Sequence, residues 1–332
     1  MNLKEGVHVI YDLLLFIGMT VIYFTEAALL MLIPRRYRAK SIAGEIALVT
    51  GGAGGIGRLI AIKLAKLGAQ VIIWDIDQQG LVEVAEEIKK TGGTCHTYCC
   101  DIANKEEVYR TAKATKIEVG NVSLLVNNAG YVCGKTLMEL PDREIVRTFQ
   151  VNILSHYWIT KSFLRDMMKN NHGHIVTMAS VAGLVGNYNC TDYSATKFAA
   201  VGYHESLFAE LKVHGYDKIH MTLVCPYLTN TGMFDGVKSR LMPTLEPEYV
   251  AEEVVAGILA NEMMIVLPNI MMYLLLFKCL VPAKMCWAVI YHIFKEPQAM
   301  MMFRGRQSRK VTNNGRTDLF LHTHKYDRST SL

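Results

Sequence analysis

Short runs of β-branched and aliphatic residues alternate with longer amphipathic stretches between residues 43 and 268. The apolar runs predict seven strands, at Ile46–Thr50, Val71–Asp75, Thr94–Cys99, Leu124–Asn127, His174–Ala179, His220–Cys225 and Met264–Leu267. The stretches between them predict helices, for example at Gly57–Leu67, Leu81–Thr91 and Lys105–Val119. Strands that alternate with helices are typical of a parallel sheet with right-handed crossovers. The pattern therefore predicts an α/β fold in a single domain, with a doubly wound, Rossmann-type parallel sheet.

An apolar segment at residues 7–33 precedes this region and ends before Pro34, although Asp12 and Glu26 interrupt it. Its uncharged part, Leu13–Thr25, is shorter than the roughly 20 residues that a spanning helix needs. No convincing small-residue cleavage site follows it, as a signal peptide would require. We therefore expect a retained membrane anchor, which either spans the bilayer with its acids near the interfaces or lies along the membrane surface.

A second apolar region, at residues 263–294, is rich in Met, Leu and Tyr, but Pro268, Lys278, Pro282 and Lys284 divide it. It either touches the bilayer beside a substrate entrance or packs as a C-terminal core helix. The expected organisation is a membrane anchor with a basic flank (1–40), an α/β domain (41–268), an apolar membrane-proximal or substrate-entrance segment (269–303) and a basic polar tail (304–332).

The net charge of +5 is modest, but basic residues cluster after each apolar region. The two clusters are Arg35, Arg36, Arg38 and Lys40, and Arg304, Arg306, Arg309 and Lys310. Neither cluster has a recognition motif or interleaved aromatic residues, so we expect no nucleic-acid partner. Basic residues beside apolar segments are typical of contacts with anionic lipid headgroups and stay on the cytosolic side. The α/β domain is therefore expected to face the cytosol.

Eight cysteines are present, yet they form neither a short disulfide framework nor a CxxC pair, and no His/Cys cluster has zinc spacing. Several of them fall in predicted buried strands. We expect free, reduced core cysteines and no metal site.

The first predicted strand ends in a glycine-rich turn that opens a helix. Thr50, Gly51, Gly55 and Gly57 fit the pattern Thr-Gly-x3-Gly-x-Gly, with Ile56 inside it. Glycines let the backbone turn sharply and approach a pyrophosphate at the positive end of the helix. A glycine-rich loop alone is weak evidence, but its place in a βαβ unit predicts a dinucleotide site.

Asp75 ends the second predicted strand, where a carboxylate can bind both hydroxyls of the adenosine ribose and repels a 2′-phosphate. No Arg or Lys stands beside it, so the predicted cofactor is NAD. Asp101 and Ile102, after the third strand, could supply a polar contact and an apolar wall around the adenine. A solvated turn residue is the alternative interpretation of Asp75.

A set of polar residues follows in order: Asn128, Ala129 and Gly130 after the fourth strand, then Asn152, then Ser180, and finally Tyr193 and Lys197. Tyr193 and Lys197 are four residues apart, so they share one face of a helix. The motif Tyr-x3-Lys is common by chance, but the spacing of 13 residues from Ser180 to Tyr193 makes it much less so.

Together these motifs resemble the short-chain dehydrogenase/reductase family and cover residues 43–268. The apolar N-terminus and the sequences VIIWDID, NHGHIV and VCPYLTNTGMF look most similar to the membrane-bound, epidermal-type retinol dehydrogenases, with lipid-droplet 17β-hydroxysteroid dehydrogenases as near neighbours. The resemblance implies catalytic roles for Ser180, Tyr193, Lys197 and Asn152. It implies cofactor contacts at Asn128, Ala129, Gly130, Pro226 and Thr231, besides those at Tyr193 and Lys197.

The resemblance also implies a homodimer and a water-linked proton path from Lys197 through Asn152. One departure is Pro226-Tyr227, because the family often has Pro-Gly there. The resemblance and the apolar anchor together place the protein at the endoplasmic reticulum membrane or a lipid droplet.

Hydride transfer from an alcohol requires a base, and the tyrosine pKa near 10 is too high for this role at neutral pH. We expect Lys197 and the positive nicotinamide to lower the pKa of Tyr193, while Ser180 donates a hydrogen bond to the substrate oxygen. An apolar segment after Thr231 suits a lipophilic alcohol or is ordinary core packing; its apolar residues are Met233, Phe234, Val237, Leu241 and Met242.

The expected function is NAD-dependent oxidation of a lipophilic alcohol, all-trans-retinol before a 17β-hydroxysteroid or a fatty alcohol. A non-catalytic lipid-droplet binding protein is the alternative of another class, and the intact Ser-Tyr-Lys-Asn set argues against it. The C-terminal Ser-Thr-Ser-Leu resembles a PDZ ligand, with Thr330 and Leu332 in the reading positions, although so short a pattern often arises by chance.

Overall fold

The computed structural model describes residues 3–305, and the chain divides into two compact units, Met1–Ser41 and Ile42–Leu332. In the first unit, α1 (Leu3–Leu32) is followed by a 3₁₀ turn, η1 (Arg35–Tyr37). Among the described residues, α1 contains the one stretch that is long and apolar enough to cross a membrane, Glu5–Leu30, with a mean hydropathy of 2.0.

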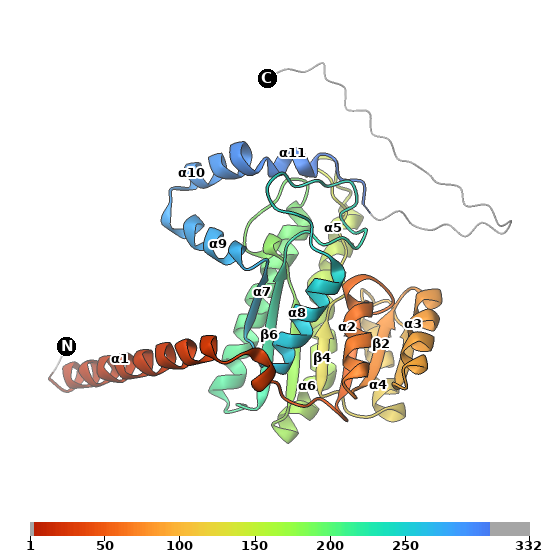
Figure 1. The fold of residues 1–332 in the computed structure, drawn as a ribbon, viewed down its shortest axis with the longest axis horizontal. Helices are drawn as coiled ribbons and strands as arrows, with labels where there is room; N and C mark the ends of the chain where they lie inside the picture. The colour runs from red at the N-terminus through yellow and green to blue at the C-terminus, as the bar shows by residue number, and fades with distance from the viewer. Residues whose placement is uncertain (1–2, 306–332) are drawn as a thin grey trace, which may run out of the picture. The chain divides into compact units, whose positions relative to one another are not determined.

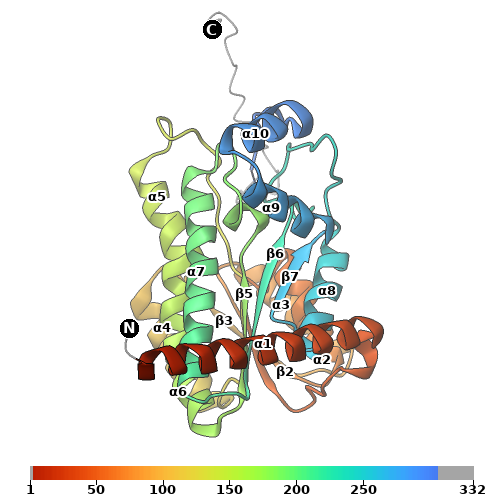
Figure 2. The same cartoon turned by 90° about the vertical axis from the view of Figure 1, so that its left-hand side faces the viewer.

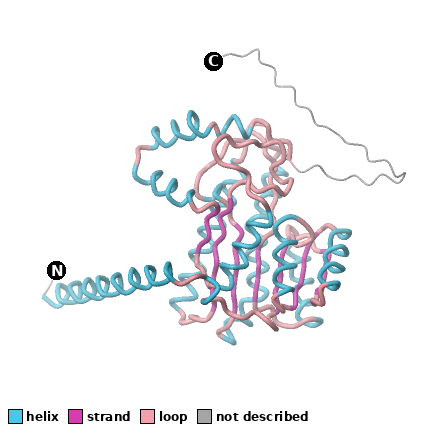
Figure 3. Tube along the Cα trace, viewed as in Figure 1, coloured by secondary structure: helices cyan, strands magenta, loops and turns pink. Residues whose placement is uncertain are grey.

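The second unit is built on a seven-stranded parallel sheet with the order β3-β2-β1-β4-β5-β6-β7 (Figure 1). Its strands are β1 (Ile46–Thr50), β2 (Gln70–Asp75), β3 (Cys95–Cys99), β4 (Leu124–Asn127), β5 (Gly173–Met178), β6 (Ile219–Pro226) and β7 (Met264–Leu267). Figure 3 shows them side by side with helices on both sides. The strand order reverses between β1 and β4, which is the topological switch point of a doubly wound fold. The predicted fold class is confirmed.

Helices cover both faces of the sheet, as Figure 2 shows. One face carries α2 (Gly55–Lys66), α3 (Gln78–Lys90) and α8 (Pro247–Leu259), and the other carries α4 (Lys105–Glu118), α6 (Ser155–Asn170) and α7 (Thr191–Val213). Successive strand side chains point to opposite faces, so Val49 packs in the first of these cores and Leu48 in the second. Because both of their faces are buried, the inner strands are mostly apolar, whereas the edge strand β3 has no buried residue.

One helix changes its winding beside the carboxyl end of β4. The helix α5 (Asp142–Phe149) continues through a π-helical turn, η2 (Gln150–Leu154), into α6. A π-turn inserts extra backbone into a helix and shifts the direction of its side chains, often at functional sites. Asn152 lies in this turn and is fully buried. A second short turn, η3 (Val181–Gly183), follows β5.

The C-terminal apolar region forms several short helices at one end of the sheet (Figure 1). They are α9 (Ile270–Leu280), α10 (Ala283–Ala288), the π-helical η4 (Val289–Phe294) and α11 (Glu296–Met300). Pro282 lies between α9 and α10, where it removes a backbone donor and ends the first helix. In this region Met271 is buried against the α/β core, whereas Leu280 is 82% exposed, and the expected contact with the bilayer stays a prediction.

All eight cysteines are free. Cys100, Cys190 and Cys225 are buried, whereas Cys99 and Cys279 are exposed. The expectation of core thiols was therefore wrong for the last two, because β3 is an edge strand and α9 has an outer face.

Candidate active site

A cavity of about 240 Å³ lies at the carboxyl ends of the strands, beside the switch point between β1 and β4. Of the predicted site residues, it is lined by Gly51, Gly55, Ile56, Asp75, Asp101, Ile102, Asn128, Ala129, Gly130, Ser180, Tyr193, Lys197, Pro226 and Thr231. Three other predicted residues, Thr50, Gly57 and Asn152, lie behind this wall rather than in it.

Thr50 and Gly57 shape the glycine-rich turn from behind. The Thr50 hydroxyl accepts the backbone N–H groups of Asn128 (3.0 Å) and Ala129 (3.1 Å), which fixes β1 against the turn after β4. A Cβ on Gly57 would overlap the Gly51 carbonyl oxygen and the Asn128 amide. Gly51 has φ +66°, and a Cβ there would meet Ala129 Cα at 2.8 Å. The turn therefore has room only for glycine at both positions.

Asp75 closes the same cavity from β2 and holds the glycine-rich turn. Its Oδ2 accepts from the Ala53 N–H at 3.0 Å, and its Oδ1 accepts from the Asp77 N–H at 3.0 Å. A carboxylate has about four acceptor sites, so two remain for hydroxyl donors. A glycine cradle at the N-terminus of α2 with a fixed carboxylate beside it fits the pyrophosphate and ribose of a nicotinamide dinucleotide.

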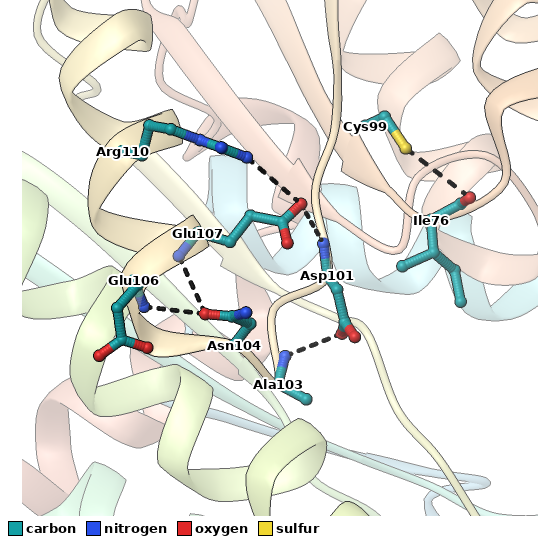
Figure 4. Close-up of polar contacts among 8 residues, drawn as sticks. All are labelled: Ile76, Cys99, Asp101, Ala103, Asn104, Glu106, Glu107 and Arg110. Carbon is teal, nitrogen blue, oxygen red and sulfur yellow. Dashed lines mark hydrogen bonds and ion pairs between the residues drawn. The ribbon is translucent and has the colours of Figure 1, made fainter.

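Asp101 makes more hydrogen bonds within the protein than the sequence indicated. Its carboxylate accepts from the Ala103 N–H at 3.0 Å, and its own N–H donates to Glu107 at 3.1 Å (Figure 4). Arg147 of α5 donates to its other oxygen at 2.8 Å and also lines the cavity. Arg147 was not predicted from the sequence, because one arginine on an amphipathic helix carries no signal of its partner.

Tyr193 and Lys197 lie one turn apart on α7, and both are buried. The Lys197 Nζ is 5.6 Å from the Tyr193 ring centroid and donates to the Met178 carbonyl at 2.7 Å. Ser180 follows β5 and donates to the Pro226 carbonyl at 3.3 Å. A hydrogen bond links Ser180 to Tyr193. The hydroxyl, phenol and ammonium groups thus converge on one cavity.

Burial acts on both titratable groups of this set. It raises the pKa of the Tyr193 phenol, and the hydrogen bond to Ser180 opposes that change. It lowers the pKa of the Lys197 ammonium to about 8. Since desolvation disfavours both charged forms, the protein alone keeps the phenol protonated at neutral pH. The expected lowering of the Tyr193 pKa by Lys197 and the nicotinamide must therefore overcome this burial.

Asn152 connects the turn after β4 to α7. Its Oδ1 accepts the Tyr131 N–H at 2.7 Å, and its Nδ2 donates to the Tyr131 carbonyl at 2.9 Å and to the Thr196 hydroxyl at 3.0 Å. Both amide hydrogens are thus used within the protein. The side chain thereby holds α7 at Thr196, the residue before Lys197, and the expected water-linked path through Asn152 stays a prediction.

Apolar residues after Thr231 approach the phenol. Phe234 meets the Tyr193 ring edge-on with centroids 5.5 Å apart, and Phe303 meets Phe234 at 5.9 Å. Met233 also lines the cavity, whereas Leu241 is 52% exposed. An apolar wall therefore faces the hydroxyl and phenol groups, as a lipophilic substrate requires.

Comparison with known proteins shows which sequences this chain resembles. The sequence model of a family described as short chain dehydrogenase matches residues 45–241. The chain is 42% identical to short-chain dehydrogenase/reductase family 16C member 6 of Bos taurus (84% of this chain, 89% of that one) and 41% identical to epidermal retinol dehydrogenase 2 of Homo sapiens (82% and 89%). It is 40% identical to estradiol 17-beta-dehydrogenase 11 of Mus musculus, over 89% of this chain and 98% of that one.

Solved structures show the same fold. A short-chain dehydrogenase/reductase from Burkholderia phymatum in complex with NAD matches 72% of this chain and 94% of its own with a TM-score of 0.66 and 26% identity. A metagenomic short-chain oxidoreductase in complex with NADP matches 68% and 96% with a TM-score of 0.59 and 29% identity.

Proposed function

The chain belongs to the short-chain dehydrogenase family, and we propose that this oxidoreductase oxidises a lipophilic alcohol, all-trans-retinol before others, with NAD as its cofactor. The observation that carries the proposal is the convergence of Ser180, Tyr193 and Lys197 on one cavity with an apolar wall. Relatives named for retinol and for estradiol support an alcohol of this class.

Each polar group has a distinct role in this proposal. Ser180 donates a hydrogen bond to the substrate oxygen, and the ionised Tyr193 accepts the hydroxyl proton. Lys197, in its charged form, favours the phenolate and holds the nicotinamide ribose. The nicotinamide, when bound, accepts the hydride from the substrate carbon. The alcohol thereby loses one hydride and one proton and becomes a carbonyl compound.

NAD rather than NADP is supported by Asp75. Its carboxylate lies in the cavity wall, where it can accept ribose hydroxyls and repels a 2′-phosphate. Thr231 lines the same cavity, and its side chain lies 3.4 Å from the position of a Cβ on Gly55, so it borders the glycine-rich turn that would hold the cofactor.

Membrane attachment is part of the proposal. The apolar α1 supports an anchor, and the exposed apolar side chains of α9 support a second lipid contact. We place the catalytic domain on the cytosolic side of the endoplasmic reticulum or of a lipid droplet. Homodimerisation stays a prediction, and the possible PDZ residues Thr330 and Leu332 lie outside the described residues.

The test is NADH formation by the full-length protein in detergent, with all-trans-retinol, a panel of sterols and fatty alcohols. Tyr193→Phe should lower the rate by about 10²-fold or more, because it removes the base. Tyr203→Phe is the matched control, since Tyr203 is another buried tyrosine of α7 that does not line the cavity. It should retain the rate within about twofold.

If the protein oxidises only a sterol, the proposed mechanism stands and the proposed substrate, all-trans-retinol, is wrong. If NADH binds but none of the alcohols is oxidised, the enzymatic proposal is wrong and a binding role takes its place. Equal loss in Tyr193→Phe and Tyr203→Phe would show that the effect is structural rather than chemical.

A further inference from the structure

A second cavity, of about 100 Å³, lies between the catalytic cavity and the C-terminal helices. Its walls are almost entirely apolar and come from α9, α10, η4 and the loops after β5 and β6. Val181, Asn187 and Tyr227 line both cavities, so the two spaces adjoin at these residues. Nothing in the chemistry of Ser180, Tyr193 and Lys197 requires this second space.

Tyr227 stands at the junction, at the position where the family often has glycine. Its hydroxyl donates to Ser239 at 3.0 Å, and its ring packs against the apolar cores on both sides of β6. A side chain thus replaces open space at this point. Because the Tyr227 side chain occupies the junction between the two cavities, the connection favours an extended hydrocarbon chain over a fused ring system.

The helices that cover the second cavity are apolar on both faces. On α9, Leu274 and Leu275 line the cavity, whereas the neighbouring Leu276 is 57% exposed. On the following segment, Ile290 lines the cavity and Trp287 is 57% exposed. A helix at a water surface carries polar residues on its outer side. Apolar residues on both sides fit a cover with lipid outside and a hydrocarbon ligand inside.

The charged groups at this cavity do not favour an anionic ligand. Lys278 donates to the Leu184 carbonyl at 2.7 Å, which holds its ammonium at the backbone of the loop after β5. Burial raises the pKa of Glu296 to about 7, against the Tyr188 N–H that favours its charged form. A carboxyl group that is readily protonated in an apolar wall is compatible with hydrocarbon and repels an anion when ionised.

We propose that the second cavity is the subsite for the hydrocarbon chain of the substrate, which reaches it past Tyr227 and Val181 while its hydroxyl lies at Ser180 and Tyr193. This inference rests on the proposed function and narrows its substrate to an alcohol with an extended chain, such as a polyene or long alkyl alcohol. The hydrocarbon chain of the substrate enters beneath α9 and η4, and the length of this hydrocarbon determines how much of the subsite it fills.

The test compares two neighbouring leucines of α9 in the full-length protein. Leu275→Trp fills the subsite, and Leu276→Trp places the same side chain on the exposed face. With NAD and primary alcohols from hexanol to hexadecanol, Leu275→Trp should lower kcat/KM for hexadecanol about tenfold or more and leave hexanol within about twofold. Leu276→Trp should change neither. An equal effect of Leu275→Trp on both alcohols, or no effect, overturns the subsite.

Two further measurements separate the possible failures. NADH binding reports whether each variant folds. If Leu275→Trp fails to bind NADH, Leu275→Ala is used in its place. Leu275→Ala enlarges the subsite and should raise kcat/KM for alcohols with bulkier chains relative to kcat/KM for hexanol. An unchanged preference in Leu275→Ala then overturns the inference. If the unsubstituted protein oxidises no alcohol, the proposed function is wrong, and equilibrium dialysis of tritiated retinol tests the subsite alone. Retinol binding lost in Leu275→Trp but kept in Leu276→Trp supports it, and equal binding contradicts it.

Discussion

Asp75 binds two backbone N–H groups of the protein with the same carboxylate that faces the cofactor cavity. It therefore acts in two ways: it fixes the turn at Ala53, and it presents a negative charge where the adenosine ribose would lie. A hydrogen bond to a charged group contributes about 1.5–3 kcal/mol, and the charge adds repulsion toward a phosphate. The two effects can be separated by substitution.

Asp75→Ser removes the charge and most of the acceptor capacity. We expect the ratio of kcat/KM for NAD to that for NADP to fall about tenfold or more, which corresponds to about 1.4 kcal/mol. Asp75→Asn also removes the charge but retains an acceptor for one of the two N–H groups, so it should lower the ratio as well while disturbing the turn at Ala53 less. Steady-state kinetics with both cofactors give the ratio. A Ser variant that keeps the original preference would contradict the assignment of Asp75 to cofactor selection.

The strands were predictable from local sequence. β1, β4 and β7 begin and end at the predicted residues, and the other strands differ by one residue at an end or at both ends. Central parallel strands are buried on both faces, so each appears in the sequence as an apolar run bounded by turn residues. The glycine-rich turn was equally clear, since its glycines answer a local requirement at Gly51 and Gly57.

What the sequence could not provide are contacts between distant segments. The π-turn at Asn152 joins Tyr131 to Thr196, and the pair of Arg147 with Asp101 spans two elements. Neither has a periodic signal. The departure at Tyr227 was visible in the sequence, but its place between two cavities depends on how α9 and η4 fold over β6. Tertiary packing decided each of these features.

The anchor helix α1 can be tested separately from the outer face of α9. A chain that lacks residues 1–40 should still bind NADH, because the α/β unit has its own core. In a flotation assay the truncated protein should still bind lipid vesicles through α9. The double variant Leu276→Glu, Leu280→Glu of the truncated protein should no longer bind them, since charged side chains disfavour insertion into lipid. Val82→Glu, on the exposed side of α3, is the control. Full release by the deletion alone would show that α9 contributes no lipid contact.

The packed core as a whole should make the protein sensitive to acid through its buried histidines. Burial lowers the pKa of His156 to about 3 and that of His204 to about 4. The unfolded chain binds protons at both residues below about pH 6.5, whereas the folded protein does not, so the free energy of unfolding falls as the pH drops below that value. Each histidine should cost about 2 kcal/mol at pH 5.

Glu296 acts in the opposite direction, because its folded pKa of about 7 lies above its unfolded value. Above about pH 7 the buried, ionised carboxylate destabilises the folded protein, and protonation removes this penalty as the pH falls toward 5. Substitution separates the two contributions. Between pH 7 and pH 5, His204→Gln should lose about 2 kcal/mol less than the unsubstituted protein, and Glu296→Gln about 2 kcal/mol more. Denaturant unfolding at both pH values measures these differences, and the exposed His214→Gln is the control. If His204→Gln and His214→Gln show the same pH dependence, the buried ring of His204 is not the origin of the acid sensitivity, and the packing between α7 and β5 tolerates its charge.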